Sequence, residues 1–478
     1  MNEYLIIYDV RGIQNYIFKT NKIKEITGAS IIVKDKLPAL LEELLSKDNK
    51  YVSDWKNQQF KFLKDSSILA EIVYVGGGNL LLAFRGDEES LKEFNDKLQK
   101  RFLEETYSLS LAYATVKMTK DFKSDLSNVK KLLKNVKKRM PQLVMSPACP
   151  IVEIDQYTSD VLSCEIYDNK ISMESYLKLN AYKNAPMDRG IKFIDSIAGK
   201  DERNENSKTM IGIVHIDGNN LGEMISKFYE GRIITSYEEA VKLSREVSLT
   251  IEEAFNDVVC DALGDIDYRI VINSGDDITF ICKAEYALVA SQKVINQIET
   301  KKLGNINFSA CGGIVFVHSH FPFFRAYEMA EECCSIAKKR AKLPQNMVNG
   351  RATSFIDYEI CDAGILLDIA TLRSMHQDLY LKPYAVSKTL PKNEMHIESF
   401  LDKIQALQKV SRTTVKQLRN IYQLGYEHTC VYYEKIKSRI NLFNHYDCYI
   451  NNVATLYDAC SMIDLVKLNN KEECSNDL

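Results

Sequence analysis

Three carboxylates have the type and position needed to hold divalent metal ions. Asp276 and Asp277 stand side by side at a glycine-containing turn in the stretch NSGDDITFIC, and Asp217 ends another apolar run, IGIVHID. Like charges crowded at strand ends are destabilising unless a cation neutralises them. Carboxylate oxygens suit Mg²⁺ or Mn²⁺. We therefore predict a two-metal site of the kind used in phosphoryl transfer, with Asp217, Asp276 and Asp277 as catalytic metal ligands. The alternative is an ordinary Asp-rich turn.

The residues around these acids suit a nucleoside triphosphate. Backbone N–H groups between a strand and the N-terminus of a helix bind phosphate oxygens readily. The nucleotide-binding residues expected in this part of the chain are Gly218, Asn219, Asn220, Leu221, Ser274 and Gly275. Lys338, in the basic helix end SIAKKRAK, is expected to neutralise the terminal phosphate, with Lys339, Arg340 and Lys342 nearby. A solvated basic helix end is the alternative for these cations.

The elements that must position these residues occur twice in the chain. YVGGGNLLLAF (Tyr74–Phe84) aligns with INSGDDITFIC (Ile272–Cys282), and EYLIIYDVRGIQNYIF aligns in type with IGIVHIDGNNLGEMI. Each copy continues into a further strand and a helix with a basic end. The repeated order strand–helix–hairpin–helix–strand–helix predicts an α+β fold of two ferredoxin-like domains. Each is expected to have a four-stranded antiparallel sheet covered by helices on one face.

The first copy differs from the second at the hairpin. Gly78 and Asn79 occupy the positions of Asp276 and Asp277, so this copy keeps only Asp9 of the three acids. One carboxylate is not expected to hold two divalent ions, whereas glycines permit close approach of a ligand to the backbone. We expect the first copy either to bind a second nucleotide through Gly77, Gly78 and Asn79 or to act as a scaffold, without catalysing.

Length and composition indicate several domains without a membrane span. The 478 residues exceed one ordinary hydrophobic core. We place the domain of the first copy at 1–144, a linker subdomain at 145–206, the catalytic domain of the second copy at 207–360 and a helical domain at 361–478. Zinc is not expected in the linker, because Cys149 and Cys164 alone cannot complete a tetrahedral site. Twelve cysteines without a C-x-x-C pair, and no signal peptide, indicate reduced thiols and a cytoplasmic location.

Other features have less specific interpretations. Lys+Arg number 62 and Asp+Glu 65, so no overall basic charge indicates nucleic acid binding. The basic stretch VKKLLKNVKKR (Val129–Arg139) could contact phosphate backbones, with a solvated helix face as the alternative. His215, His318 and His320 lie in or beside apolar strands and are expected to be packed or solvent-facing.

In the order of its motifs, the chain resembles the large palm-domain subunit of type III CRISPR effector complexes, the CRISPR-polymerase family. GIQNYIFKTNKIKEITGASIIV and YVGGGNLLLAF resemble the opening and the degenerate hairpin of its first palm. HIDGNNLG and SGDD resemble the strand-end Asp motif and the GGDD motif of its second palm, with Ser274 replacing a glycine. The closing strand and helix of that palm and the family's C-terminal helical domain also have counterparts here.

The resemblance implies two cyclase-like palms that convert ATP into cyclic oligoadenylates with Mg²⁺ or Mn²⁺, in antiviral defence. It also implies other effector subunits and guide or target RNA as partners. No His-Asp dipeptide occurs in the sequence, so the family's HD nuclease domain is not expected. Two alternatives stay open: a cyclic mono- or dinucleotide cyclase of the GGDEF type, and a mainly structural subunit of an RNA-guided complex.

Overall fold

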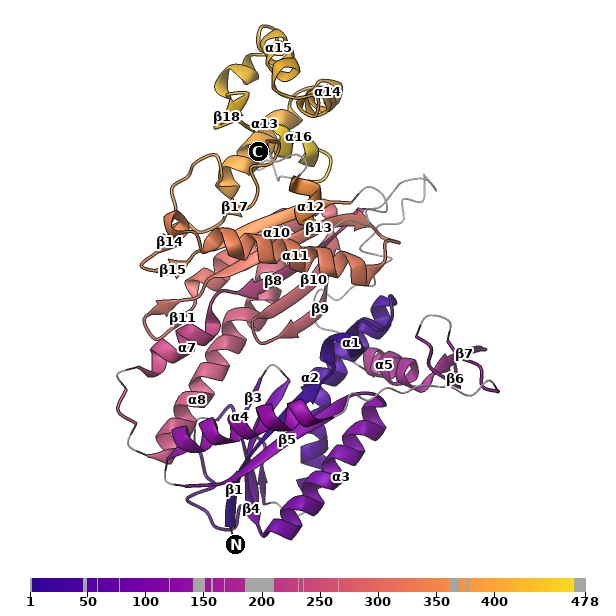
Figure 1. Ribbon diagram of the computed structural model, residues 1–478, viewed down its shortest axis with the longest axis vertical. Helices are drawn as coiled ribbons and strands as arrows, with labels where there is room; N and C mark the ends of the chain where they lie inside the picture. The colour runs from indigo at the N-terminus through magenta and orange to yellow at the C-terminus, as the bar shows by residue number, and fades with distance from the viewer. Residues whose placement is uncertain are drawn as a thin grey trace, which may run out of the picture. The chain divides into compact units, whose positions relative to one another are not determined.

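The computed structural model describes residues 2–467 apart from short gaps and one longer gap at 185–209. The short gaps are 46–49, 58, 77, 120, 141–150, 156–157, 167, 231, 235, 265, 362–368 and 375–377. The chain forms two compact units (Figure 1). Unit 1 comprises Met1–Met187, Gly222–Asn256 and Val271–Asp276, and unit 2 comprises Asp188–Leu221, Asp257–Ile270 and Asp277–Leu478.

Unit 1 is built on a mainly antiparallel sheet in the order β2-β3-β4-β1-β5. Its strands are β1 (Asn2–Arg11), β2 (Tyr51–Val52), β3 (Ala70–Gly76), β4 (Asn79–Gly86) and β5 (Ser110–Lys117). Without the short parallel edge strand β2, this is the ferredoxin-like order, in which the first strand lies in the middle. The predicted α+β class is confirmed.

Helices cover both faces of this sheet, so the expectation of one covered face is wrong. On one face, the hydroxyl of Tyr8 donates to Asn95 of α3 (Glu88–Thr106) at 2.6 Å. On the other, Leu5 and Ile7 belong to a buried cluster with α4 (Phe122–Arg139) and α8 (Tyr237–Glu252). Successive side chains of a strand point to opposite faces. The unbroken buried run of β1 therefore requires cover on both sides.

Helix α8 follows the first strand of the second copy in sequence, yet it belongs to unit 1. Its Arg245 is fully buried and donates to Glu71 at 2.9 Å and to the carbonyl oxygens of Ile72 and Val73. The other carboxylate oxygen of Glu71 accepts the N–H groups of Lys61 and Phe62. A buried ion pair needs such additional hydrogen bonds to offset its desolvation. These bonds fasten α8 to strand β3.

Unit 1 has further helices and a small hairpin. These are α1 (Ile13–Ile17), α2 (Ile23–Leu45), β6 (Leu162–Ile166), β7 (Asn169–Ser172), α5 (Met173–Asn184) and α7, whose Leu221–Tyr229 starts at the boundary of the two units. Helix α2 packs tightly on α5, because a Cβ at Gly28 would lie 1.8 Å from the carbonyl oxygen of Lys178. Lys178 is buried and donates to Glu174 at 2.5 Å and to the carbonyl oxygen of Tyr16 at 2.6 Å.

The second sheet repeats the ferredoxin-like order and extends it. Its order is β17-β16-β13-β8-β10-β9. The strands are β8 (Met210–Gly218), β9 (Tyr268–Ser274), β10 (Asp277–Lys283), β13 (Ala310–His318), β16 (Phe355–Ile360) and β17 (Tyr384–Ala385). Strands β8, β9, β10 and β13 take the places that β1, β3, β4 and β5 have in the first sheet. Strand β16 adds in parallel to β13, and β17 pairs with β16.

Helices also pack on both faces of the second sheet. A Cβ at Gly212 would lie 2.3 Å from the Cβ of Ala287 in α10 (Ala284–Thr300). A Cβ at Gly313 would lie 1.9 Å from the carbonyl oxygen of Ala330 in α11 (Phe323–Ala341). Gly313 is the cross-strand partner of His215, whose side chain points to the face opposite that of Gly212. The absence of a side chain at each glycine lets a helix approach the sheet closely.

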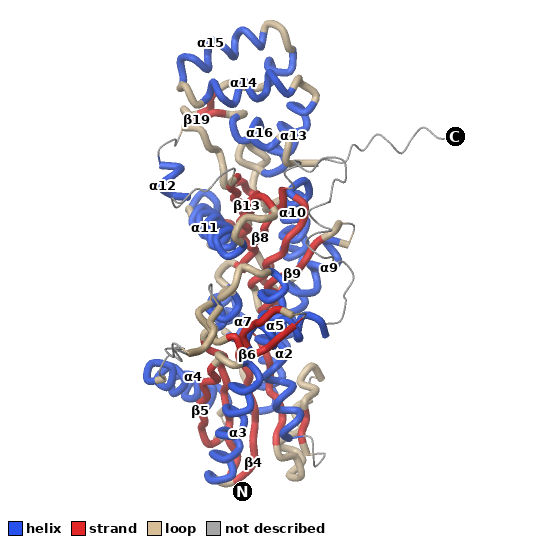
Figure 2. The backbone as a smooth tube through the Cα atoms, turned by 90° about the vertical axis from the view of Figure 1, so that its right-hand side faces the viewer, coloured by secondary structure: helices blue, strands red, loops and turns tan. Residues whose placement is uncertain are grey.

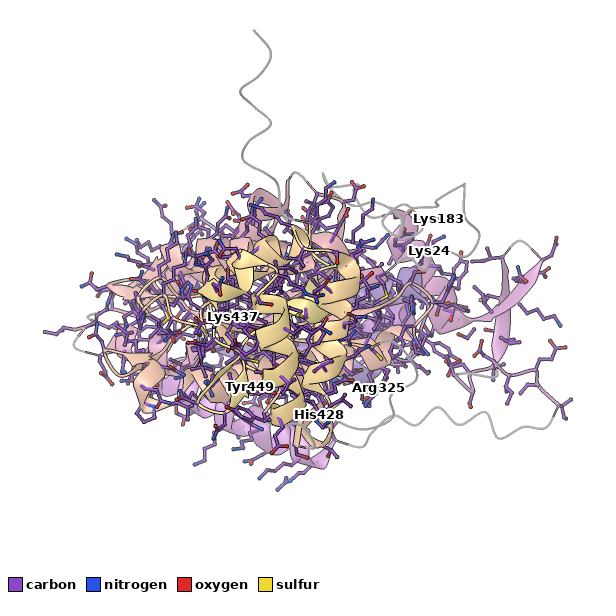
Figure 3. The ribbon with its side chains drawn as sticks, turned by 90° about the horizontal axis from the view of Figure 1, so that it is seen from above. Lys24, Lys183, Arg325, His428, Lys437 and Tyr449 are labelled. Atoms are coloured by element: carbon purple, nitrogen blue, oxygen red, sulfur yellow. The ribbon has the colours of Figure 1, made fainter. Side chains whose placement is uncertain are left out.

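The last part of unit 2 is largely helical. Figure 2 shows the helices α13, α14, α15 and α16, and Figure 3 labels His428 and Lys437, which belong to α15. Their bounds are Ile397–Gln408, Arg412–Tyr422, Tyr426–Lys437 and Tyr457–Met462. The remaining elements of the second copy and the C-terminal region are η2 (Glu253–Asp257), α9 (Val258–Leu263), β11 (Lys302–Leu303), β12 (Ile306–Asn307), η3 (Pro344–Asn346), β14 (Met347–Val348), β15 (Arg351–Ala352), α12 (Ile369–Ser374), η4 (Asn441–His445), β18 (Tyr449–Ile450) and β19 (Val453–Ala454). The four domain boundaries given above stay predictions.

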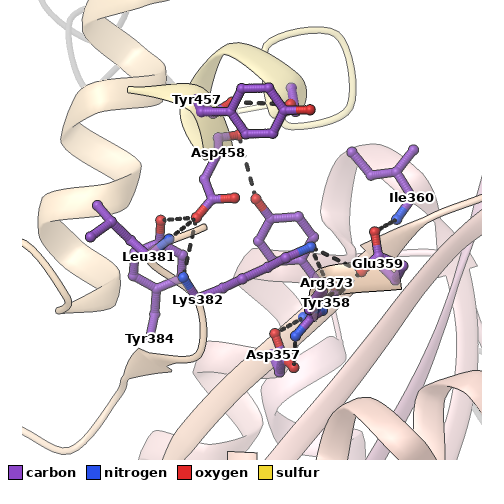
Figure 4. A network of polar contacts seen from close by, with 11 residues as sticks. Asp357, Tyr358, Glu359, Ile360, Arg373, Leu381, Lys382, Tyr384, Tyr457 and Asp458 are labelled. Atoms are coloured by element: carbon purple, nitrogen blue, oxygen red, sulfur yellow. Dashed lines mark hydrogen bonds and ion pairs between the residues drawn. The ribbon is translucent and has the colours of Figure 1, made fainter. Parts of the chain in front are cut away.

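A buried charged network connects β16 to the segment that follows it (Figure 4). Arg373 donates to Asp357 at 2.6 Å and to Glu359 at 2.9 Å, and Lys382 donates to Glu359 at 3.1 Å. Nearby, Asp458 at the start of α16 accepts the N–H of Lys382 and the hydroxyl of Tyr384. Burial raises the pKa of Asp357, while Arg373 and Lys382 act to lower it. Helix α16 is thus joined to the segment after β16 through the hydrogen bonds that Asp458 accepts.

No helix in the described ranges is long and apolar enough to cross a membrane.

Candidate active site

Asp217 and Asp277 lie directly opposite each other on adjacent strands. Their Cα atoms are register partners in the antiparallel pair β8–β10. Cross-strand partners place their side chains on the same face of a sheet. Each side chain is about one-third exposed, with a relative exposure of 35% for both. The two carboxylates therefore share one solvent-accessible end of the sheet.

The hairpin between β9 and β10 turns at Gly275 and Asp276. Gly275 has φ +65°, a left-handed conformation that glycine adopts without strain. Asp276 is half-buried. Ser274, Gly275 and Asp276 belong to unit 1, whereas Asp217 and Asp277 belong to unit 2. The shared role of the three acids stays a prediction. Among the described residues, no group of three or more His, Cys, Asp or Glu side chains is arranged to hold a metal ion.

Lys338 is bound to the first of these carboxylates. From the last turn of α11, its Nζ donates to Asp217 at 2.5 Å and to the carbonyl oxygen of Gly218 at 2.9 Å. Burial acts to lower the pKa of Lys338, but the hydrogen bond and charge of Asp217 outweigh it and leave the pKa above its ordinary value. Lys338 is thus a cation at neutral pH, placed at the same strand end as the two acids.

A buried histidine lies beside the second carboxylate. Nδ1 of His215 lies 3.3 Å from Asp277 and 3.1 Å from the hydroxyl of Thr279, and its ring meets Tyr327 edge-on at 5.6 Å. Burial lowers the pKa of His215 to about 4, so the ring is neutral at pH 7. The sequence predicts that His215 is packed or solvent-facing, and the structure shows that it is packed. The sequence did not predict that His215 lies beside Asp277.

The segment after β8 is ordered partly by its own contacts. The backbone N–H of Asn219 donates to the carbonyl oxygen of Ser309 at 2.9 Å. The side-chain amide of Asn219 donates to the carbonyl oxygen of Thr353 at 3.0 Å. This N–H group is therefore already used within the fold. Asn220 is exposed with φ +51°, and Leu221 begins α7. Nucleotide binding by Gly218, Asn219, Asn220 and Leu221 stays a prediction.

The first copy has a closely similar arrangement without the second acid. Asp9 pairs in register with Asn79, as Asp217 pairs with Asp277. Asp9 forms an ion pair with Lys137 near the end of α4, as Asp217 does with Lys338. Alignment of the two basic helix ends could have identified Lys137 as the counterpart of Lys338. Gly78 turns the hairpin with φ +78°, and Gly77 lies outside the described residues.

Of the two linker cysteines, the described residues include Cys164. Cys149 lies outside those residues, and Cys164 is half-buried with its thiol 3.7 Å from the sulfur of Met173. The expectation that zinc is absent stays a prediction.

The structure thus has two sheets of ferredoxin-like order, the second with paired acids at a strand end. Comparison with known families adds that residues 210–346 match the family model of the Cas10/Cmr2 second palm domain. The predicted resemblance to the palm subunit of type III CRISPR complexes is therefore confirmed for the second palm. No curated protein matches the sequence.

Solved structures of Csm1 have a similar fold. One is described as "Crystal structure of Csm1-Csm4 cassette in complex with cA4", with 12% identity and TM-score 0.51, covering 97% of this chain and 69% of that chain. Csm1 of T. onnurineus has 14% identity, TM-score 0.51 and the same coverages. The Csm1-Csm4 cassette with AMPPNP has 14% identity and TM-score 0.46, covering 71% of this chain and 53% of that chain. The chain thus spans between about half and two-thirds of these proteins' length.

Proposed function

We propose that the protein is a metal-dependent nucleotidyltransferase that converts ATP into cyclic oligoadenylates. The observation that carries this proposal is the pairing of Asp217 with Asp277 at one strand end, beside the cation of Lys338. These residues lie within the segment that matches the Cas10/Cmr2 second palm domain. Structures of the same fold are described in complex with cA4, and this supports the choice of an adenine oligonucleotide as product.

The donor set fits a hard divalent cation. Asp217 and Asp277 supply carboxylate oxygens from adjacent strands on one face, and both remain partly exposed. Mg²⁺ and Mn²⁺ prefer such oxygen ligands, which are mixed with water or substrate phosphates. Asp217, Asp276 and Asp277 would hold the ions. When bound, the ions would lower the pKa of the attacking hydroxyl and offset charge on the leaving oxygen.

The side chains of the site have separate tasks in this reaction. A 3′-hydroxyl of one nucleotide forms a bond to the α-phosphorus of the next, the α–β phosphoanhydride bond breaks, and pyrophosphate leaves. Lys338 moves its charge from Asp217 to the triphosphate, which its flexible stem and three donors permit. His215 stays neutral, contacts the hydroxyl of Thr279 through its Nδ1 and lies beside Asp277 without adding charge to the site. Repeated transfer followed by ring closure gives the cyclic product.

The direct test is product mass. Purified protein would be incubated with each of the four ribonucleoside triphosphates and Mn²⁺, and products identified by mass spectrometry. ATP is expected to give a cyclic oligoadenylate and pyrophosphate, and EDTA is expected to abolish both. The double substitution Asp276→Ala with Asp277→Ala should remove activity without changing the melting temperature by more than a few degrees. The control substitution Asp96→Ala, which removes an exposed carboxylate of α3, should leave activity in place.

Two results would contradict this assignment. Full activity of the double variant would reject these acids as metal ligands. A cyclic mono- or dinucleotide product would instead indicate a cyclase of the GGDEF type.

We further propose that the protein works with another effector subunit, as Csm1 is found with Csm4 in the solved complexes. Copurification from the native host distinguishes a complex from a synthase that acts alone. Partner subunits and RNA recovered with an inactive protein would favour a structural role.

A further inference from the structure

Helix α4 carries a surface far more basic than the chain as a whole. Between Phe122 and Arg139 it has seven Lys and Arg residues and a single acid, Asp125, whereas the chain has 62 Lys+Arg against 65 Asp+Glu. Asp125 is buried and accepts both the N–H and the hydroxyl of Thr119. It is therefore turned away from the exposed lysines. The positive charge of α4 is not balanced within the helix.

Three of these lysines form a row along one side of the helix, where partial desolvation lowers the pKa of Lys130. Lys130, Lys134 and Lys138 are exposed and spaced four residues apart, so they follow one side of the helix with a rise of about 6 Å per step. Val129 and Leu133 on the inner side are buried in the core of unit 1. In the described part of the chain, no acid forms an ion pair with this row of lysines.

Helix α3 of the same unit provides the contrast. It has six acids and four bases between Glu88 and Thr106. Its Arg101 pairs with Glu43 at 3.0 Å and with Glu105 at 2.7 Å, and Lys100 lies 4.0 Å from Glu104. Mixed charges of this kind are usual for a solvated helix face. The row of lysines on α4 has no acidic residues beside it on the same helix that would pair with it.

We propose that the row Lys130–Lys134–Lys138 is a docking surface for the phosphate backbone of a double-stranded nucleic acid. Three like charges at this spacing repel each other, and a regular polyanion removes that repulsion while releasing counterions. Proteins that hold single strands use exposed aromatic platforms for the bases. The only aromatic residue of α4, Phe122, is buried. The surface thus contacts phosphates only and is insensitive to base sequence.

Binding by the full-length chain tests the proposal. Fluorescently labelled RNA and DNA duplexes of one sequence, and the matching single strands, would be titrated at several salt concentrations. The variant K130Q/K134Q/K138Q should bind both duplexes more than about tenfold more weakly. The slope of log binding constant against log salt concentration should become shallower by about 0.9 for each lysine removed. Glutamine preserves helix propensity, so the fold should persist. The control K92Q/K97Q/K100Q removes three exposed lysines from α3 and should bind like the wild type.

Several outcomes would overturn the proposal. These are no duplex binding by the wild type at low salt, equal losses in the two triple variants, or single strands that bind more tightly than duplexes. Competition by polyglutamate as effective as that by duplex would indicate an acidic protein partner instead. Product formation from ATP, measured in the same variants, should be unchanged, so the proposed synthase activity and this surface can fail separately.

Discussion

Asp217 and Asp277 occupy the same cross-strand register position in the second sheet as Asp9 and Asn79 in the first. The duplication therefore extends to individual residue pairs and not only to the order of elements. Each strand-end aspartate also has a lysine partner from the helix after the last ferredoxin-like strand. What distinguishes the two copies is the hairpin, where the second has two acids and the first has none. This difference is the basis for assigning catalysis to the second copy alone.

The two lysines should differ in function although their contacts are alike. Lys338→Met is expected to lower the rate of cyclic product formation by about 10- to 100-fold, because it removes a charged hydrogen bond that we assign to the triphosphate. Lys137→Met, in the first copy, should retain most of the activity. Steady-state assays with ATP and Mn²⁺ would measure both. Equal loss in the two variants would indicate that the lysines have only a structural role.

His215 should make the protein sensitive to acid. Its pKa is about 4 when folded and 6.5 in its ordinary state, so the unfolded chain binds the proton more readily. Stability is therefore complete above about pH 6.5 and is lost as the pH falls towards 4, by about 3 kcal/mol at most. Melting temperatures would be measured between pH 7 and 4 for the wild type and for His215→Gln. As the pH falls, the melting temperature should decrease less in the variant than in the wild type. The exposed His320, changed to Gln, is the control and should decline like the wild type.

The charged network next to β16 should be costly to break. Arg373→Met would leave Asp357, which is fully buried, without its closest cation, and should destabilise the protein by about 3–5 kcal/mol. Arg325→Met removes an exposed pair with Glu328 at 3.2 Å and should cost about 0–1 kcal/mol. Chemical denaturation would compare them. Adding Asp357→Asn to Arg373→Met should recover part of the loss, and failure to do so would show that packing of the arginine matters more than its charge.

The glycine beneath α11 should not tolerate a side chain. In Gly313→Ala the new Cβ would overlap the carbonyl oxygen of Ala330, so α11 must move, at a cost of about 1–3 kcal/mol. Product formation should fall as well, because Lys338 is carried on this helix. Gly264→Ala is a control, since its nearest atom would be 3.6 Å away. Similar melting temperatures for the two variants would contradict the close approach.

Much of the site could be predicted because its residues interrupt apolar runs. Asp217, Asp276 and Asp277 are visible as charges at strand ends, and their positions in the copies follow from simple alignment. Pairing of Lys338 with Asp217 depends on side-chain reach, which spacing along the chain does not supply. The second covered face of each sheet was missed for a related reason. Arg245 and Glu71 are 174 residues apart, and no local pattern links residues at such a distance.

The placement of α8 affects how the gene can be divided. Although the sequence contains two copies of one module, a cut between them would remove from the first copy the helix that buries Leu5 and Ile7 and would leave Glu71 without Arg245. An N-terminal fragment made this way would have an apolar surface and an uncompensated interior charge. The two halves are therefore not expected to fold properly when they are expressed separately. The boundary between the two sequence copies does not coincide with the boundary of a folding unit.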